Sequence, residues 1–530
     1  MRSGTSKTKD CAAKSLLTNT DTKGRSAERT VVAGKQQAVD VLRTEHLSAD
    51  LRGRSVRGGF WTVSSQGAQF IIQSVSTIVL ARLLTPADFG LVAMVAAVTV
   101  LGQAFADLGL SEATIQSEVI NHDQVSTLFW INVAIGIGLM LLTMALAPLL
   151  VWFYGEPRLK EITIVMSLTF LIGGLRVQHT ALLQRQMQFK SLAFRDAVSA
   201  VLGVTVAIVL ALRGAGYWAI ISLPLAFNFT QMTLSWILVG WIPGPPKRNA
   251  KVRSLIVFGS NVAGSYLLGN ITGNADSVLI GWYWGAGPLG LYSRAFNLLM
   301  LPVRQLSGPI GMVALPTLSR LHDDPDRLAR YYLRLLNLIT WLAAPIFGFL
   351  FVAAEPVIIL VLGRRWLEAA PIFQILAIQA LAQLVVITSM WLLSSQGHSA
   401  RLLKLLLITS PIMVASFAIG LRFGVRGVAL AGSLAQVALI PFALKFSFHG
   451  TALTLRRFGR SILCPISVSL ASVSVALLGL HVFAPRYLFS QLLVSFLGFA
   501  VIHATSVAIR PLRKEMMAIR ELFGELRLTA

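Results

Sequence analysis

Arginines inside otherwise apolar stretches are the residues of this sequence best suited to chemistry. Arg176, Arg294 and Arg304 each lie within a run of hydrophobic residues long enough to form a helix. A guanidinium group stays charged and grips two oxygens at once, which suits an anionic group such as a pyrophosphate. Such a charge near the centre of a bilayer costs about 2.5–3.5 kcal/mol or more, so something must offset it. Anion binding is one explanation; pairing of Arg294 with Asp276, or snorkelling toward the interface, is the structural alternative.

Two of the apolar runs also carry polar stripes. The stripes consist of Gln66, Gln69, Gln73 and Ser76, spaced 3, 4 and 3, and of Asn261, Ser265, Thr272 and Asp276, spaced 4, 7 and 4. Both spacings place the side chains on one helical face, which must then contact protein or water. A hydrophilic cavity lined by Gln69, Gln73, Asn261 and Thr272 is one interpretation, and hydrogen bonds between helices are the other. Asp276 is a candidate for coupling an ion or a proton, or a structural counter-ion.

Other chemical motifs fail on their context. Residues 285–290 have the form GxGxxG, which occurs in dinucleotide-binding sites. Such a site also needs a strand before the glycines and an acidic residue about 20 positions later, and this sequence has neither. The eight histidines lack metal-ligand spacing, and the two cysteines, Cys11 and Cys464, lie far apart. We therefore expect no cofactor, no metal and no catalytic residues, and without a Walker A motif ATP is not the direct energy source.

The elements that must position these side chains are membrane helices. Only 13% of the 530 residues are charged, about half the usual share, and 55% are hydrophobic. The net charge of +23 suits nucleic acid, but the charges lie in short loops between apolar runs, so we expect no nucleic-acid partner. Runs of about 20 apolar residues span a bilayer and must be helical. The sequence predicts about fourteen spans, at residues 60–81, 89–109, 128–153, 162–183, 194–212, 216–241, 254–281, 291–315, 335–361, 370–393, 401–421, 425–446, 461–483 and 488–509.

The placement of Lys and Arg predicts the orientation of these spans. Thirty-four lie in the two tails and the loops on one side, against nine in the alternate loops. The positive-inside rule therefore places both termini in the cytoplasm. Residues 110–127 hold acidic residues and no Lys or Arg, but acidic residues carry little topological weight. Residues 1–57 are polar and basic, without the apolar core of a signal peptide, and we expect a disordered cytoplasmic tail that contacts membrane lipids.

A weak internal repeat predicts how the spans are grouped. Residues 79–91 recur with one insertion as residues 278–291, and residues 213–219 resemble residues 423–429, both offset by six helices. An even shift keeps orientation, so the halves would be parallel repeats with the substrate path between them; chance similarity of Gly-rich turns is the alternative. The predicted division is a tail (1–57), an N-terminal six-helix bundle (58–245), a C-terminal six-helix bundle (246–450), two additional helices (451–510) and a C-terminal tail (511–530).

Several of these segments resemble a known family. They are residues 80–92 (LARLLTPADFGLV), 105–110 (FADLGL), 274–281 (NADSVLIG), 290–296 (GLYSRAF) and 315–320 (LPTLSR). Together they are similar to the Wzx-type polysaccharide transporters of the multidrug/oligosaccharidyl-lipid/polysaccharide exporter superfamily. The resemblance covers residues 55–460, and the long N-terminal tail departs from the family pattern.

The resemblance implies two six-helix bundles, two extra helices and alternating access for an undecaprenyl-pyrophosphate-linked repeat unit at the bacterial inner membrane. The implied partners are this lipid-linked oligosaccharide, membrane lipids, a polysaccharide polymerase and export machinery. The resemblance also implies a cationic cavity for the substrate, and Arg294 and Arg304 are the candidate residues for it. A multidrug-type cation-coupled exporter and a lipid II flippase remain as alternatives. A membrane polymerase or ligase fits less well, because the periplasmic loops are short.

Overall fold

The computed structural model describes residues 51–106, 109–117, 120–247, 273–485 and 487–508, and this part of the chain contains helices and connecting loops without strands. The predicted all-helical fold class is therefore confirmed. The helices are α2 (Leu51–Leu83), α3 (Pro86–Ala106), α4 (Leu110–Gln116), α5 (His122–Tyr154), α6 (Leu159–Arg185), α7 (Phe189–Leu212), α8 (Tyr217–Val239), α10 (Ala286–Arg320), α11 (Pro325–Val352), α12 (Ala354–Val361), α13 (Ala369–Ser395), α14 (Ser399–Gly420), α15 (Gly424–Phe448), α16 (Leu455–Phe483) and α17 (Leu488–Ala508), with 3-10 turns η2 (Arg364–Trp366) and η3 (Leu421–Phe423). Residues 273–284 are also helical.

The length and composition of these helices make the chain a multi-pass membrane protein. Ten helical segments of the described residues are long and apolar enough to cross a membrane, with α14 and α15 counted as one segment. Helix α2 is long enough but carries the polar stripe, and α3 contributes a shorter apolar stretch, at residues 86–100. The number fourteen stays a prediction, because residues 254–272 of the seventh predicted span lie outside the described residues.

Local signals that hydropathy does not contain set where several helices begin and end. Helix α5 begins at His122, before the predicted residue 128, because Asn121 and Gln124 form a reciprocal capping box. The side chain of Asn121 accepts from the Gln124 backbone N–H at 2.9 Å, and the Gln124 side chain accepts from the Asn121 N–H at 3.0 Å. The helix ends at Tyr154, and Gly155 caps it in the left-handed conformation that glycine tolerates.

The predicted span 335–361 is wrong as a single helix. The structure divides it at Ala353 into α11 and α12. Pro356 lies in the first turn of α12, where its missing N–H breaks no helical hydrogen bond, so a new helix begins there readily. Hydropathy does not register this break, because both pieces are apolar.

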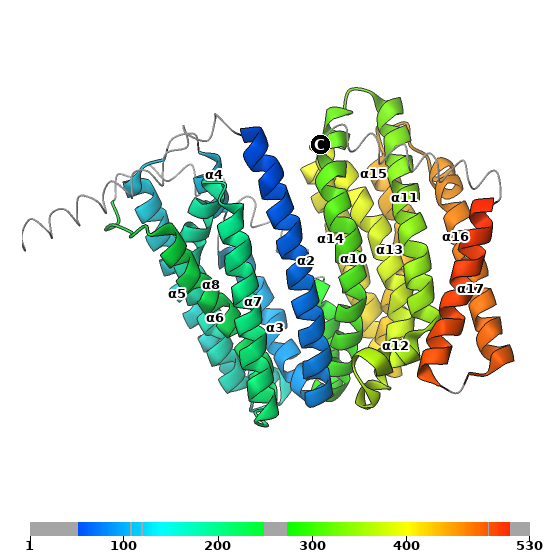
Figure 1. Cartoon of the computed structure of the whole chain (residues 1–530), viewed down its shortest axis with the longest axis horizontal. Helices are drawn as coiled ribbons and strands as arrows, with labels where there is room; N and C mark the ends of the chain where they lie inside the picture. Colours follow the sequence, from blue (N-terminus) through cyan, green and yellow to red (C-terminus); the bar gives the residue numbers. More distant parts are fainter. Residues whose placement is uncertain (1–50, 107–108, 118–119, 248–272, 486, 509–530) are drawn as a thin grey trace, which may run out of the picture.

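The helices form two groups that Figure 1 shows side by side. Helices α2 to α8 make up the first group, in which α5 packs on α6, and α7 packs on both α8 and α2. In the second group α13 packs between α10 and α15, and α14 packs on α15. Helices α16 and α17 pack on each other and on α11 at the outer side of the second group. Helix α3 contacts both α6 and α10, so it connects the two groups.

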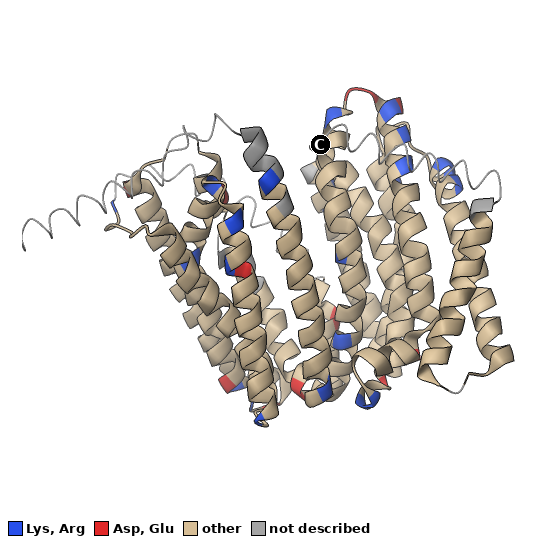
Figure 2. Cartoon of the chain, in the orientation of Figure 1, with Lys and Arg blue, Asp and Glu red and all other residues tan. Residues whose placement is uncertain are grey.

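Most charged residues lie toward the two ends of the helices, as the coloured ribbon of Figure 2 shows. One end carries the last turns of α10 and the first turns of α11 and α16, with several arginines. The opposite end includes the loop between α5 and α6, where Arg158 donates to Glu156 at 2.7 Å and lowers the pKa of that carboxyl group. A belt poor in charge between the ends is what a hydrocarbon layer requires.

Candidate functional site

Arg294 on α10 lies where the two groups of helices meet. Its guanidinium carbon is 3.9 Å from the centroid of the Phe89 ring on α3, a cation–π contact that joins the groups. Phe89 meets Trp366 edge-on with ring centroids 5.4 Å apart, and the indole N–H of Trp366 donates to the Ala81 carbonyl at 2.8 Å. Among the described residues no carboxylate pairs with Arg294, and its buried Nε has no hydrogen-bond acceptor. Arg294 therefore remains a cation that an anionic ligand can pair with.

Asp276 bonds to partners other than Arg294, the residue with which the sequence suggested that it could pair. Its carboxylate accepts from the Tyr292 hydroxyl at 2.6 Å and from the Ser277 backbone N–H at 2.6 Å. The side chain is buried in the second group, on the helical segment that precedes α10. Asp276 lines a cavity and forms no ion pair with Arg294.

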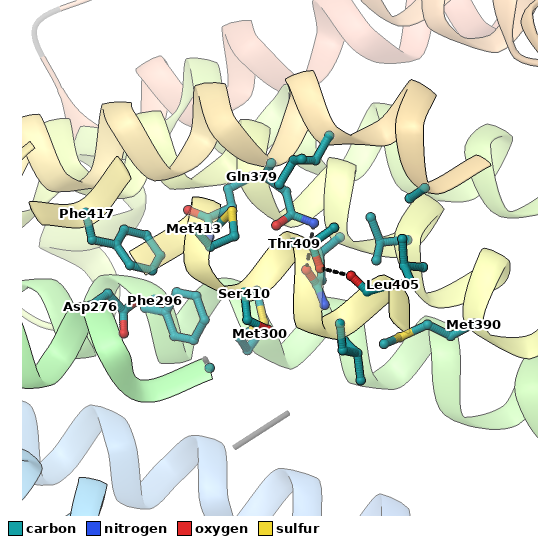
Figure 3. Close-up of a pocket in the computed structure, with 17 residues that line it drawn as sticks. Asp276, Phe296, Met300, Gln379, Met390, Leu405, Thr409, Ser410, Met413 and Phe417 are labelled. Atoms are coloured by element: carbon teal, nitrogen blue, oxygen red, sulfur yellow. Dashed lines mark hydrogen bonds between the residues drawn. The ribbon is translucent and has the colours of Figure 1, made fainter. Parts of the chain in front are cut away.

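That cavity has a volume of about 240 Å³ and lies within the second group, between residues 273–276, α10, α13, α14 and α15. Figure 3 shows Asp276 and Phe417 at one end of it and Met390 at the other. Its polar groups are Asp276, Gln379, Gln383, Thr409, Ser410 and Gln436. Gln436 donates to Gln383 at 3.2 Å. These glutamines were not predicted from the sequence, although the spacing of four between Gln379 and Gln383 within a predicted span is a signal that could have identified them.

Arg176 on α6 belongs to a hydrogen-bonded network inside the first group. Its guanidinium donates to the side chain of Gln231 on α8. Gln231 donates in turn to Asp196 Oδ1 at 2.8 Å, and Arg195 forms an ion pair with the same oxygen at 2.6 Å. The predicted span 194–212 begins one residue before Arg195, whereas α7 begins at Phe189 and buries this arginine. Arg176 is therefore linked to a second, unpredicted arginine through an amide and a carboxylate.

The residues of the predicted polar stripe on α2 do not share one environment: some line a pocket and others lie outside it. Gln69 lines a pocket of about 310 Å³ between α2, the end of α6 and the start of α7, together with Gln66, Arg195 and Asp196; we call it the α2–α7 pocket. Gln73 is exposed and lies outside this pocket.

Arg304 is exposed on α10 and makes no hydrogen bond with any described residue. Asn261 and Thr272 lie outside the described residues.

The two repeated segments of the sequence meet each other in space. A Cβ atom at Gly90 would overlap the carbonyl oxygen of Ala286, and one at Gly290 would overlap the carbonyl oxygen of Pro86. The starts of α3 and α10 therefore cross backbone to backbone, which only glycine permits. Nearby, Arg82 donates to the Leu360 carbonyl at 2.6 Å. We call this part of the molecule, with the Phe89–Trp366 contact, the joined end.

Comparison with known proteins identifies the family. A family model described as polysaccharide biosynthesis protein matches residues 79–371. The lipopolysaccharide biosynthesis protein WzxC of Escherichia coli K12 is 24% identical over 341 residues, covering 63% of this chain and 68% of WzxC. The succinoglycan biosynthesis transport protein ExoT of Rhizobium meliloti is 27% identical over 320 residues, covering 60% of this chain and 64% of ExoT.

A solved structure of the lipid II flippase MurJ, in an inward closed conformation, has a similar fold. The TM-score is 0.65 at 14% identity, with 85% of this chain and 99% of MurJ covered. At this identity the similarity concerns the fold alone. The sequence motifs, the helical fold and the matched residues 79–371 agree, and the resemblance that the sequence indicated is confirmed: this chain belongs to the polysaccharide biosynthesis protein family.

Proposed function

We propose that this protein is a flippase that carries undecaprenyl-pyrophosphate-linked oligosaccharide repeat units across the bacterial inner membrane for exopolysaccharide or lipopolysaccharide synthesis. The observation that carries the proposal is the family match over residues 79–371. Relatives named for lipopolysaccharide biosynthesis and succinoglycan transport support it, as does a fold shared with a lipid II flippase. In this proposal the protein moves its substrate without catalysis, and a polymerase and export machinery consume what it delivers.

Alternating access of the two bundles, residues 58–245 and 246–450, is the proposed mechanism. The joined end holds the bundles together through the glycine crossing and the Arg82–Leu360 hydrogen bond. In the proposal this end faces the periplasm and both termini face the cytoplasm, because Lys and Arg are fewer in the loops of the joined end. Transport would then require the crossing at Gly90 and Gly290 to separate while the opposite end closes.

The candidate side chains take distinct roles in this proposal. Arg294, Arg304 and Arg176 would bind the pyrophosphate, because guanidinium groups pair with its oxygens. Gln69, Gln73, Asn261 and Thr272 would contact sugar hydroxyls through groups that both donate and accept. Asp276, buried beside the cavity of Figure 3, would couple transport to a cation or proton gradient.

Deletion of the gene tests the proposed function against its alternatives. We expect lipid-linked repeat units with a finished oligosaccharide to accumulate on the cytoplasmic side, and surface polysaccharide to disappear. A multidrug-type exporter predicts altered drug tolerance with unchanged lipid intermediates. A lipid II flippase predicts accumulation of lipid II and loss of cell-wall synthesis. Analysis of undecaprenyl-linked lipids from the deletion strain separates the three results.

A further inference from the structure

The α2–α7 pocket gathers polar groups from three helices, α2, α6 and α7. Hydroxyl, amide and carboxylate groups of Ser65, Gln66, Gln69 and Asp196 line it. Leu192 contributes an apolar surface to the same pocket. Polar side chains in membrane helices are costly unless they find partners or a ligand, so their convergence on a space of about 310 Å³ calls for an occupant.

The charged groups of the pocket are already balanced, which argues against an anionic occupant. Arg195 donates from Nε at 2.8 Å and from Nη2 at 2.6 Å to Asp196 Oδ1. Its remaining nitrogen, Nη1, donates to Thr180 at 2.9 Å and Ser235 at 3.1 Å. Because every nitrogen of this guanidinium group already donates within the protein, it is poorly placed to grip a phosphate. The ion pair leaves the two charged groups of the pocket neutral together.

The α2–α7 pocket still has hydrogen-bond acceptors and donors without a partner among the described residues, and these suit hydroxyl groups. All three donors to Asp196 bond to Oδ1, and no described residue donates to its Oδ2. Gln66 is exposed and makes no hydrogen bond with any described residue. Gln69 donates from Nε2 to Ser65 at 3.2 Å, which leaves its carbonyl oxygen free. A sugar hydroxyl both donates and accepts, so it can use a free carboxylate oxygen and free amides together.

From this geometry we propose that the α2–α7 pocket binds a neutral sugar residue of the lipid-linked oligosaccharide. The proposal rests on the function proposed above and adds a saccharide site inside the first group of helices, apart from the arginines Arg294 and Arg304. The hydroxyls of the sugar bond to Gln66, Gln69 and Asp196 Oδ2, and its carbon face packs on Leu192. The pyrophosphate and the lipid lie outside this pocket.

Binding to the full-length protein in nanodiscs tests the proposal. The probes are the lipid-linked repeat unit extracted from the deletion strain and undecaprenyl pyrophosphate without sugar, each titrated and measured by native mass spectrometry. Gln66→Leu should weaken binding of the sugar-loaded lipid about three- to tenfold, as the loss of one hydrogen bond implies, and leave binding of the bare lipid unchanged. Gln69→Leu should show the same difference. Ser64→Leu, on the exposed side of the same turn outside the pocket, is the matched control and should change neither affinity.

The outcomes separate this inference from the proposed function. Equal weakening for both lipids would mean that the pocket serves the pyrophosphate, and it would overturn the saccharide site. Wild-type affinity of both glutamine variants for the sugar-loaded lipid would also overturn it while leaving the flippase function intact. Failure of the wild-type protein to bind either lipid would instead refute the proposed function, and the saccharide site with it.

Discussion

Polar side chains in the described helices are of two kinds. Some make all of their hydrogen bonds within the protein, and others have donors or acceptors without a partner among the described residues. Arg195 uses all of its nitrogens on Asp196, Thr180 and Ser235, so its charge stabilises the first group of helices. Arg304 is exposed and has no such partner among the described residues. A charge that the protein leaves unpaired within a membrane span is the one available to a ligand. For a single residue, a charge or hydrogen-bonding group without a partner in the protein is therefore a better guide to ligand binding than the residue type.

Replacement of Arg304 by alanine tests this distinction. Arg304→Ala should abolish export of the surface polysaccharide, because the charge-assisted bonds of Arg304 to the pyrophosphate are lost. The amount of protein in the membrane should stay normal, because the substitution removes no hydrogen bond to any described residue. Loss of such a bond, about 1.5–3 kcal/mol, lowers affinity roughly 10- to 150-fold. Polysaccharide staining and an immunoblot of membranes measure the two quantities. Arg320→Ala, in the last turn of the same helix, should export normally; normal polysaccharide in Arg304→Ala would refute the assignment.

Sequence reasoning identified the unusual side chains but not their partners. Arg294 and Asp276 were found because charge in an apolar run is rare. Their actual neighbours, Phe89 for Arg294 and Tyr292 for Asp276, depend on how the helices pack. Arg195 was missed because it lies at the edge of the predicted span 194–212, whereas α7 begins at Phe189 and buries it against Thr180 and Ser235. Partners distant in sequence leave no local pattern.

Helices of this chain are positioned by close backbone contacts as much as by apolar side chains. At the crossing of α3 and α10, Gly90 and Gly290 let the two backbones touch. The two glycines occupy matching positions of the repeat found in the sequence, so the repeated segments form one reciprocal contact. The apolar runs predicted which segments become helices, but the break at Ala353 depends on helix-terminal signals that hydropathy lacks.

Alanine at either glycine should weaken this contact. Gly90→Ala and Gly290→Ala each place a methyl group where a carbonyl oxygen of the other helix lies, and such overpacking costs about 1–3 kcal/mol. We expect lower thermal unfolding temperatures for the purified variants and reduced polysaccharide export. Gly287→Ala is the matched control, because a Cβ there meets no atom within 4 Å and alanine favours the helix. Unfolding temperatures equal to wild type for both variants would contradict a tight crossing.

The molecule as a whole consists of two helix groups whose contacts at the joined end come from segments far apart in sequence. Trp366 of the second group donates to Ala81 of the first, and Arg82 donates to Leu360. Figure 1 shows α2 and α10 close together at this end and farther apart toward the other. If the groups move as bodies, the contacts of the joined end are the ones that must break, whereas the packing within each group is kept.

A covalent link across the joined end should therefore stop transport. Cysteines at Arg82 and Leu360, in a chain with Cys11→Ser and Cys464→Ser, can be joined by a short cleavable bis-thiosulfonate reagent, because both side chains are exposed. In proteoliposomes we expect translocation of the lipid-linked repeat unit to fall to background while the link is present and to recover after reduction. Cysteines at Glu156 and Arg158, linked within one loop of the first group, should leave the rate unchanged. Undiminished translocation by the protein linked across the joined end would mean that the groups do not separate there, and alternating access through this end would have to be abandoned.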